Sequence, residues 1–305
     1  MPDLTLEIAG LKLDNPVMVA SGTFGYAREF ESYMDLNRLG AIITKTVTLE
    51  PRPGNPPPRI AETPAGMLNS IGLPNVGVER FCSEKLPYLT ALSTRIVVNV
   101  AGKTGEDFVR VVERLDSIER IDAFELNYSC PNVKQGGLSF SADPVLAQQV
   151  TRAVRQATRK PIFAKLTPNV TSISDIGLAV QDGGADAVSA INTFVGMSID
   201  VRTRRPVLST VTGGLSGPAI RPLALAKVYE LCKRLDIPVI AIGGIMSAED
   251  ALEFFFAGAK AVQVGTANFV DPDAAIKIID GLDHHCRVLG VDRFTELIGT
   301  LDTGL

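Results

Sequence analysis

Histidine and cysteine are scarce in this chain of 305 residues. The two histidines, His284 and His285, are adjacent and lie late in the sequence. Because histidine is the most common proton-transfer residue of enzymes, any acid–base chemistry here is expected to depend on another side chain. The four cysteines lie far apart and form no C-x-x-C pair. This spacing argues against a disulfide framework, and no zinc, iron–sulfur or other metal site is predicted on this chain.

Basic runs and long apolar runs are also missing. The 30 basic and 34 acidic residues give a formal charge of −4, and no basic patch interleaved with aromatic residues occurs. Nucleic acid is therefore not an expected partner. No apolar stretch reaches the roughly 18 residues that a transmembrane helix needs. Residues 1–4 carry no basic region before an apolar one. We expect a cytoplasmic protein that makes no membrane contact.

What the sequence does contain is a series of short apolar runs separated by amphipathic segments. The runs are mostly continuous Val, Ile, Ala and Leu, as in parallel strands that are buried on both faces. They span residues 16–21, 41–46, 95–100, 123–127, 161–166, 187–192, 238–242 and 261–264. Eight strand–helix units over about 250 residues predict a (β/α)8 barrel of the α/β class. A doubly wound sheet is the alternative, but it usually carries a G-x-G-x-x-G fingerprint, which this sequence lacks.

Three further segments surround this repeating pattern. Residues 4–13 alternate between apolar and polar around a glycine, which predicts a β-hairpin before the barrel. The connections 48–75 and 193–217 are longer than ordinary barrel loops. Both follow strands, so we expect them on the active face of the barrel. No linker divides the chain, and residues 1–305 are predicted to form a single domain.

Glycines follow the last two predicted strands. Gly243 and Gly244 come after the seventh run and before a helix that opens at residues 247–250, and Gly265 comes after the eighth. Glycine lets backbone N–H groups approach an anion, and a helix N-terminus adds a favourable dipole. Gly217 could add another donor, since Pro218 suits the first position of a helix. These residues predict a phosphate site, with tight barrel turns that hold no ligand as the alternative.

Two lysines, Lys45 and Lys165, interrupt apolar strands. A surface lysine would not need such neighbours, and an interior ammonium needs a partner. One interpretation is that the two lysines stabilise the negative charge of an electron-rich cofactor ring when the ring is reduced. A second is a Schiff-base lysine, as in barrel aldolases. An ion pair at the rim of the barrel is a third.

Four asparagines and one cysteine complete the polar set. Asn69, Asn127, Asn132 and Asn192 each donate and accept hydrogen bonds, which suits a flat ligand such as a pyrimidine, although single loop asparagines are often turn residues. Cys130 lies on a loop that carries a glycine pair at 136–137. A free thiol with a pKa near 8.5 is mostly protonated at neutral pH. Nucleophile and general base are both open for Cys130; the lack of a histidine placed to activate the thiol favours the base.

Together, these motifs resemble the class 1 dihydroorotate dehydrogenases over nearly the whole chain. The matching segments are 20–25 (ASGTFG), 44–46 (TKT), 69–73 (NSIGL), 127–132 (NYSCPN), 190–193 (AINT) and 214–217 (GLSG). Class 2 enzymes of this family carry a serine in place of the loop cysteine and an N-terminal extension, so Cys130 indicates class 1. Residues 131–137 and 213–220 resemble the catalytic subunit of subclass 1B. That subunit passes electrons to NAD⁺ through a partner subunit that carries FAD and a [2Fe-2S] cluster. The homodimeric subclass 1A, which uses fumarate, is the main rival.

The resemblance also implies a role for each motif. The phosphate of FMN would be held by Gly217, Gly243, Gly244, Gly265 and Thr266. The rest of the flavin would contact Ser21, Lys45, Thr46, Asn99, Asn127, Lys165 and Ile191. Dihydroorotate would be bound by Lys45, Asn69, Ser70, Ile71, Gly72, Leu73, Asn127, Asn132, Asn192 and Thr193.

The implied reaction is the oxidation of (S)-dihydroorotate to orotate in de novo UMP synthesis. Cys130 would take the C5 proton while hydride passes from C6 to flavin N5. The implied assembly is a heterotetramer of two catalytic chains and two partner chains. Two other hypotheses stand beside this one: a cofactor-free barrel lyase that uses Lys165 as a Schiff base, and a non-catalytic barrel subunit that binds phosphate.

Overall fold

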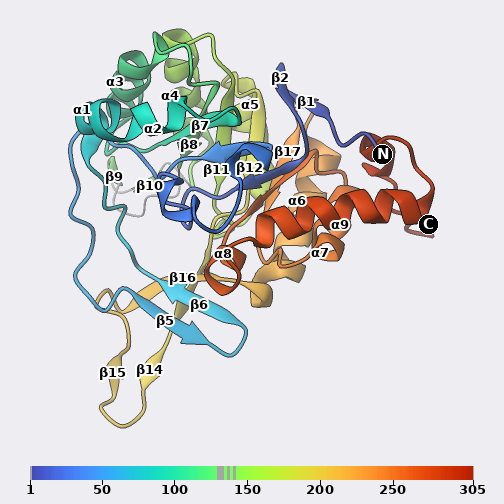
Figure 1. The fold of residues 1–305 in the computed structure, drawn as a ribbon. Coiled ribbons are helices and arrows are strands. Elements are labelled where there is room, and N and C mark those ends of the chain that lie inside the picture. Colours follow the sequence, from blue (N-terminus) through green and yellow to red (C-terminus); the bar gives the residue numbers. More distant parts are fainter. Residues whose placement is uncertain (1, 129–133, 136–137, 140–141, 305) are drawn as a thin grey trace.

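A closed barrel of eight parallel strands forms the centre of the molecule (Figure 1). The computed structural model describes residues 2–128, 134–135, 138–139 and 142–304. The barrel strands are β3 (Val17–Val19), β4 (Ala41–Ile43), β7 (Arg95–Val100), β8 (Ala123–Asn127), β11 (Ile162–Leu166), β12 (Ala187–Ala190), β17 (Val239–Ile242) and β18 (Ala261–Val264). They pair in sequence order, and β18 closes the barrel against β3. Each lies within one of the apolar runs, so the predicted (β/α)8 barrel is confirmed.

Helices surround the barrel. The longer ones are α3 (Gly105–Asp116), α4 (Pro144–Ala157), α5 (Ile173–Asp182), α6 (Arg221–Arg234), α7 (Ala248–Phe256) and α9 (Ala274–Leu289). The short ones are α1 (Gly77–Arg80), η3 (Phe81–Lys85), α2 (Leu86–Thr90) and α8 (Ala267–Val270), with 3-10 turns at η1 (Arg28–Phe30), η2 (Leu36–Arg38), η4 (Pro218–Ile220) and η5 (Phe294–Leu297). None of the helices in the described part of the chain has the length and apolar character that crossing a bilayer requires.

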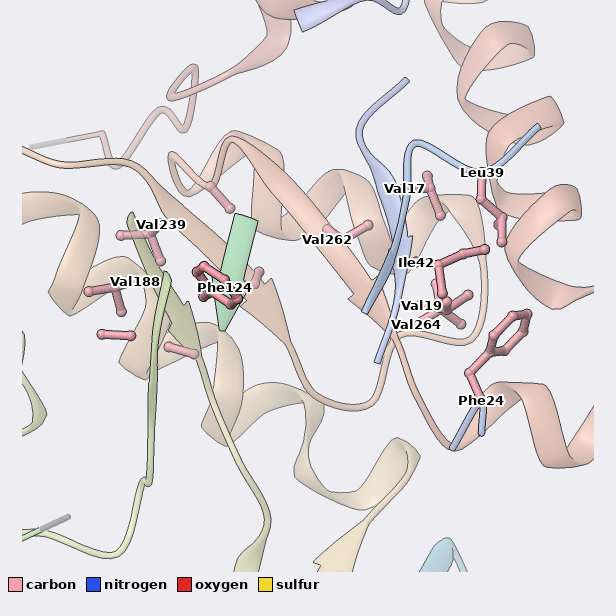
Figure 2. Packing of buried hydrophobic residues seen from close by; sticks show 14 of the residues in the cluster. Val17, Val19, Phe24, Leu39, Ile42, Phe124, Val188, Val239, Val262 and Val264 are labelled. Carbon is pink, nitrogen blue, oxygen red and sulfur yellow. The ribbon is translucent and has the colours of Figure 1, made fainter. Parts of the chain in front are cut away.

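The helices form because their apolar residues recur every three or four positions. In α3 the buried residues are Phe108, Val111, Val112 and Leu115, which lie on one face of the helix. These faces pack on the outward side chains of the strands and form the larger of two hydrophobic cores. Figure 2 shows part of this core, where Val19, Ile42 and Val264 come together from three adjacent strands.

A second, smaller core fills the inside of the barrel near the N-terminal ends of its strands. Met18, Ile43 and Phe163 belong to one buried cluster with residues of the hairpin of β1 (Leu6–Ile8) and β2 (Leu11–Leu13). Ile8 and Leu13 of this hairpin are buried in the barrel interior. The predicted hairpin at residues 4–13 is therefore confirmed. It closes the N-terminal end of the barrel and leaves the C-terminal end uncovered by the hairpin.

The two long connections form a structure of their own at the C-terminal end of the barrel. They contribute the antiparallel strands β5 (Ile60–Thr63), β6 (Gly66–Asn69), β13 (Phe194–Met197) and β16 (Thr212–Ser216), which pair in the order β13-β16-β6-β5. The small hairpin of β14 (Ile199–Asp200) and β15 (Arg205–Pro206) extends from them (Figure 1). The prediction placed these segments on the active face but treated them as loops. That detail is wrong. β5 and β6 form a local hairpin, and β16 pairs with β6 across segments far apart in sequence, a pairing that leaves no local pattern.

The remaining strand pair lies on the connection after β8. β9 (Lys134–Gln135) and β10 (Leu138–Ser139) pair antiparallel there.

Candidate active site

The polar residues at the strand ends lie at the C-terminal end of the barrel, as the sequence predicts. Ser21 follows β3, Lys45 and Thr46 follow β4, and Asn99 and Asn127 lie in the C-terminal parts of β7 and β8. Lys165 lies in β11, and Ile191, Asn192 and Thr193 follow β12. Gly243 and Gly244 follow β17, and Gly265 and Thr266 follow β18. Two predicted residues, Cys130 and Asn132, lie outside the described residues.

A buried polar layer separates this end of the barrel from the apolar core below. Its members come from different strands, and all are at most 5% exposed. They are Asn99, Glu125, Lys165, Ser189 and Gln263. Buried polar groups are costly unless hydrogen bonds satisfy them, so such a layer needs a mutual network.

Glu125 is the centre of this layer. Its carboxylate is fully buried and accepts hydrogen bonds from Asn99 Nδ2 and Gln263 Nε2, each at 2.6 Å. Lys165 Nζ lies 3.5 Å from Glu125 Oε1. Gln263 Nε2 also approaches Ser189 Oγ at 3.4 Å. Glu125 therefore collects donors from β7, β11 and β18 inside the barrel.

Glu125 does not stand out as a site residue in the sequence, because it lies within an apolar strand run. A signal was present. Glu125 and Asn127 are two positions apart, and alternate residues of a strand point to the same side. An ionisable residue inside an apolar run, on the same side as a predicted ligand residue, indicates an inward-facing polar site. Gln263, two residues before Gly265, could have been found in the same way.

Lys165 forms the ion pair that was one interpretation of the sequence, although the pair lies inside the barrel and not at its rim. The lysine is 5% exposed. Besides the approach to Glu125, its Nζ lies 3.4 Å from Ser21 Oγ. Both distances exceed the 2.7–2.9 Å of a strong charge-assisted hydrogen bond. The ammonium therefore has donor capacity left for a further acceptor.

Lys45 has a different environment. Its backbone N–H donates to the carbonyl of Gly25 at 2.8 Å, and its side chain is half-buried. Burial lowers the pKa of the Lys45 ammonium, Glu29 opposes this effect, and the positive charge of Arg59 adds to it. Lys45 and Arg59 thus concentrate positive charge at the end of β4, where an anionic group would be favoured.

Thr46 orients one of the amides in the polar layer. Its hydroxyl donates to Asn99 Oδ1 at 2.6 Å. Asn99 Nδ2 is then directed to Glu125, which fixes both ends of this amide. The amide orientation therefore depends on two buried partners.

The predicted substrate amides divide into two groups. Asn192 Nδ2 lies 3.5 Å from Asn127 Oδ1, so these two side chains come together between β8 and β12. Asn192 is held in turn by the backbone N–H of Thr193 at 2.8 Å. Asn69 donates to the carbonyl of Gly214 at 3.2 Å, which ties β6 to β16. Part of its hydrogen-bonding capacity therefore supports the protruding sheet.

The segment after Asn69 is held in place by its neighbours. Asn55 donates through its side chain to the carbonyl of Ser70 at 2.9 Å and through its backbone to the carbonyl of Ile71 at 3.0 Å. Gly72 and Leu73 both have positive φ, at 77° and 55°. The hydroxyl of Ser70 is buried and has no partner among the described residues. The segment 69–73 is thus a fixed turn beside the barrel opening.

The glycine turns are required by close packing against the start of α6. A Cβ on Gly243 would lie 2.6 Å from Ala224 Cβ, and one on Gly244 would lie 2.8 Å from the backbone nitrogen of Arg221. Gly217 has φ 96° and precedes η4, so α6 begins at Arg221. Pro218 lies in the first turn of η4 with Gly217 as its N-cap, as the sequence predicts, and α6 continues directly from Arg221.

The same turns also leave donors exposed to a ligand. Within the described ranges, the backbone N–H groups of Gly244, Gly265 and Thr266 have no acceptor. The side chain of Thr266 donates to Ser216 Oγ at 2.8 Å, which links this turn to β16. Helix α7 begins close by, with Ser247 as its N-cap. The tight-turn interpretation and the anion-site interpretation are therefore both compatible with these residues.

Comparison with known proteins identifies the family. Residues 3–286 match the family model described as dihydroorotate dehydrogenase. The chain belongs to the dihydroorotate dehydrogenase family. It is 54% identical over 301 residues to a protein of Pelobacter propionicus, with 99% of both chains covered. It is 54% identical over 302 residues to one of Geotalea uraniireducens, again over 99% of both chains. A third relative, from Geobacter sulfurreducens, is 53% identical over 301 residues and 99% of both chains.

All three relatives are named dihydroorotate dehydrogenase B (NAD(+)), catalytic subunit. The predicted resemblance to subclass 1B is thereby confirmed, as is the prediction of an oxidoreductase family that acts on dihydroorotate. Neither the lyase hypothesis nor the phosphate-binding hypothesis receives support from these relatives.

The residues present fit the FMN that this family implies. Lys165 is a buried ammonium with remaining donor capacity, which an electron-rich ring edge would use. The N–H groups of Gly244, Gly265 and Thr266 have no protein acceptor within the described residues and could bind a phosphate. Both features lie at the end of the barrel that the hairpin leaves open.

Proposed function

We propose that this chain is the FMN-binding catalytic subunit of an NAD⁺-linked dihydroorotate dehydrogenase. It would oxidise (S)-dihydroorotate to orotate in UMP synthesis, with residues 1–305 acting as one cytoplasmic domain. The proposal is carried by two observations together. Relatives of this name match nearly the whole chain, and one opening of the barrel holds the buried Lys165 and the N–H groups of Gly244 and Gly265, which are unpaired among the described residues.

The proposed mechanism assigns binding to the groups around the opening. Gly217, Gly243, Gly244, Gly265 and Thr266 would hold the phosphate of FMN. Ser21, Lys45, Thr46, Asn99, Asn127, Lys165 and Ile191 would contact the remainder of the cofactor. When bound, FMN supplies an acceptor for the hydride that leaves C6 of the substrate.

The remaining residues would hold the substrate and remove its proton. Asn127 and Asn192, which are adjacent, would hydrogen-bond the pyrimidine together with Asn132 and Thr193. Lys45 and the fixed turn of residues 69–73 would bind its carboxylate side. Cys130 Sγ would accept the C5 proton.

The first experiment tests the base. The purified protein is expected to be yellow and to be bleached by dihydroorotate without oxygen. Cys130→Ala is expected to slow this bleaching by roughly 10²- to 10⁴-fold, the usual contribution of a positioned base. Cys82→Ala is the matched control, because Cys82 is half-buried on η3 and outside the proposed site. Bleaching of Cys130→Ala at the wild-type rate would contradict the proposed base.

The second experiment tests the electron acceptor and the assembly. We infer that a partner subunit with FAD and a [2Fe-2S] cluster passes electrons from this chain to NAD⁺. The isolated chain is then expected to reduce NAD⁺ only after that subunit is added, and the complex is expected to have the mass of two catalytic and two partner chains. Reduction of fumarate by the isolated chain would favour the homodimeric alternative instead.

A further inference from the structure

The Glu125 carboxylate is the main feature of the barrel interior that the proposed mechanism does not use. Barrel interiors of this fold are mostly filled by branched apolar side chains. Here a fully buried acid occupies a central position, and burying a carboxylate is unfavourable unless partners compensate its charge. A residue of this kind needs a reason beyond filling space.

Its partners connect it directly to the proposed cofactor contacts. Asn99 and Lys165 are both in the set expected to contact the flavin, and both approach Glu125 Oε1, at 2.6 and 3.5 Å. The other oxygen of the carboxylate accepts from Gln263. Glu125 thus fixes the direction of the Asn99 amide and lies beside the positive charge of Lys165.

The charges of Lys165 and Glu125 have opposite effects on the stability of the reduced flavin ring, which carries extra electrons. A buried ammonium favours the reduced flavin, because negative charge on the ring is then compensated. A buried carboxylate next to that ammonium cancels part of its field, and the low dielectric of the barrel interior keeps both effects large. The pair can therefore set how strongly the flavin holds its electrons.

We propose that Glu125 is a positioning residue that orients Asn99 and offsets the charge of Lys165, so that the reduced flavin gives up its electrons more readily. This inference rests on the proposed function, since it requires bound FMN. It explains why a chain that passes electrons toward NAD⁺, a weak oxidant, keeps an acid under its cofactor site.

Glu125→Gln removes the charge and preserves the hydrogen-bond network. The introduced amide oxygen can still accept from Asn99. The introduced N–H₂ group would face Gln263, whose Oε1 has no partner among the described residues. If the Gln263 side-chain amide rotates by half a turn, its Oε1 can accept a hydrogen bond from the introduced N–H₂ group. The variant therefore tests charge with little change in packing.

The measurement is an equilibrium titration of the bound flavin with dithionite in the presence of a redox dye, without dihydroorotate or partner subunit. At a fixed dye potential, Glu125→Gln is expected to raise the ratio of reduced to oxidised flavin by at least roughly fivefold, the lower end of typical coupling between interacting sites. Lys165→Met is expected to lower the ratio, and the double variant should lie between the two. An unchanged or lower ratio in Glu125→Gln would overturn the proposal.

Two comparisons keep the result interpretable. Asp122→Asn removes a carboxylate just before the opposite end of the same strand, where Asp122 pairs with Arg95 and Arg120, and should leave the ratio within about twofold, because the effect of a charge falls with distance. Should Glu125→Gln fail to fold, the uncharged variants Glu125→Asn and Glu125→Met are titrated in its place, and the ratio must rise by at least roughly fivefold.

FMN binding and reduction by dihydroorotate show whether a failure concerns the role of Glu125 or the proposed function. A chain that binds FMN but is not reduced by dihydroorotate would overturn the proposed function and leave the titration decisive for Glu125. A chain that binds no FMN would overturn both.

Discussion

The two lysines of the site have the same kind of sequence context but different partners. Lys165 is deeply buried beside the Glu125 carboxylate. Lys45 is half-buried, and its neighbours are a carboxylate at Glu29 and a second cation at Arg59. The first arrangement suits a fixed charge below a cofactor, and the second suits an anion that enters and leaves. We therefore expect Lys45 to control the affinity for the carboxylate of orotate.

The lowered pKa of Lys45 makes this expectation testable by pH. Since burial moves the pKa below its ordinary value of 10.5, the ammonium loses its proton at a lower pH than an exposed lysine does. Orotate affinity should be constant below the lowered pKa and then fall by up to about tenfold per pH unit as pH rises through it. Binding is measured by titrating orotate into the oxidised enzyme. At each pH, the wild-type affinity is divided by that of Lys45→Met. Ionisation of orotate itself affects both proteins equally, so it cancels in this ratio.

Glu29→Gln provides the control for this pH dependence. The Glu29 carboxylate raises the pKa of Lys45, so its removal should move the fall in affinity to lower pH. A fall that stays at the same pH in this variant, or that persists in Lys45→Met, would show that another group is titrating.

At the residue scale, the sequence predicted the side chains that stand out from their neighbours. The sequence predicted Lys45 and Lys165 because they interrupt apolar runs, and it predicted Asn127 and Asn192 because they end such runs. Glu125 and Gln263 were not predicted, because each lies inside an apolar run and only its two-residue spacing from Asn127 or Gly265 marks it; the hydrogen bond between them forms only when the barrel closes. The turn interpretation does not describe Asn69, which ends strand β6 and whose amide ties β6 to β16.

At the element scale, two helices begin with the same chemistry at different places. Helix α3 has Thr104 as N-cap with Asp107 closing a capping box, and α7 has Ser247 with Asp250. In α7 the same aspartate also pairs with Arg221 at the start of α6, beside Gly244. The cap of α7 thus stabilises the turn that is proposed to bind phosphate. Within the described residues, the cap of α3 makes no contact with the proposed phosphate turns.

Removing each cap should separate stability from cofactor binding. Ser247→Ala and Thr104→Ala are each expected to lower the free energy of unfolding by about 1 kcal/mol, because each loses one side-chain acceptor for the first turn. Only Ser247→Ala should also weaken FMN binding, measured by titrating FMN into the apoprotein. Equal FMN affinity in the two variants would show that the α7 start does not contribute to the phosphate site.

The barrel strands and their closure were predictable, and the strands of the protruding sheet were not. Period and composition marked the eight barrel strands, and Ser247 marked the start of α7. The sheet of β5, β6, β13 and β16 depends on glycine positions whose function appears only in three dimensions. A Cβ on Gly66 would lie 2.1 Å from the carbonyl oxygen of Ser216, so the two connections can approach only with glycine there.

At the scale of the whole molecule, the barrel interior is divided along its axis. The N-terminal half is apolar and closed by the β1–β2 hairpin, and the C-terminal half is polar and bounded by the protruding sheet. The N-terminal segment also pairs with the region after α9, since Asp3 bonds with the backbone of Asp292 and Phe294. Stability and ligand binding should therefore respond separately to changes at the two ends.

Ile8→Ala tests this separation. Ile8 is fully buried against the barrel interior, so its truncation should cost about 2–5 kcal/mol of unfolding free energy, measured by urea denaturation of the apoprotein. FMN affinity should stay at the wild-type value, because the site lies at the other end of the strands. Val270→Ala, at a side chain that is 73% exposed, is the control and should change stability by less than about 0.5 kcal/mol. A loss of FMN affinity in Ile8→Ala that persists well below its unfolding midpoint would mean that the hairpin core and the polar layer form one cooperative unit.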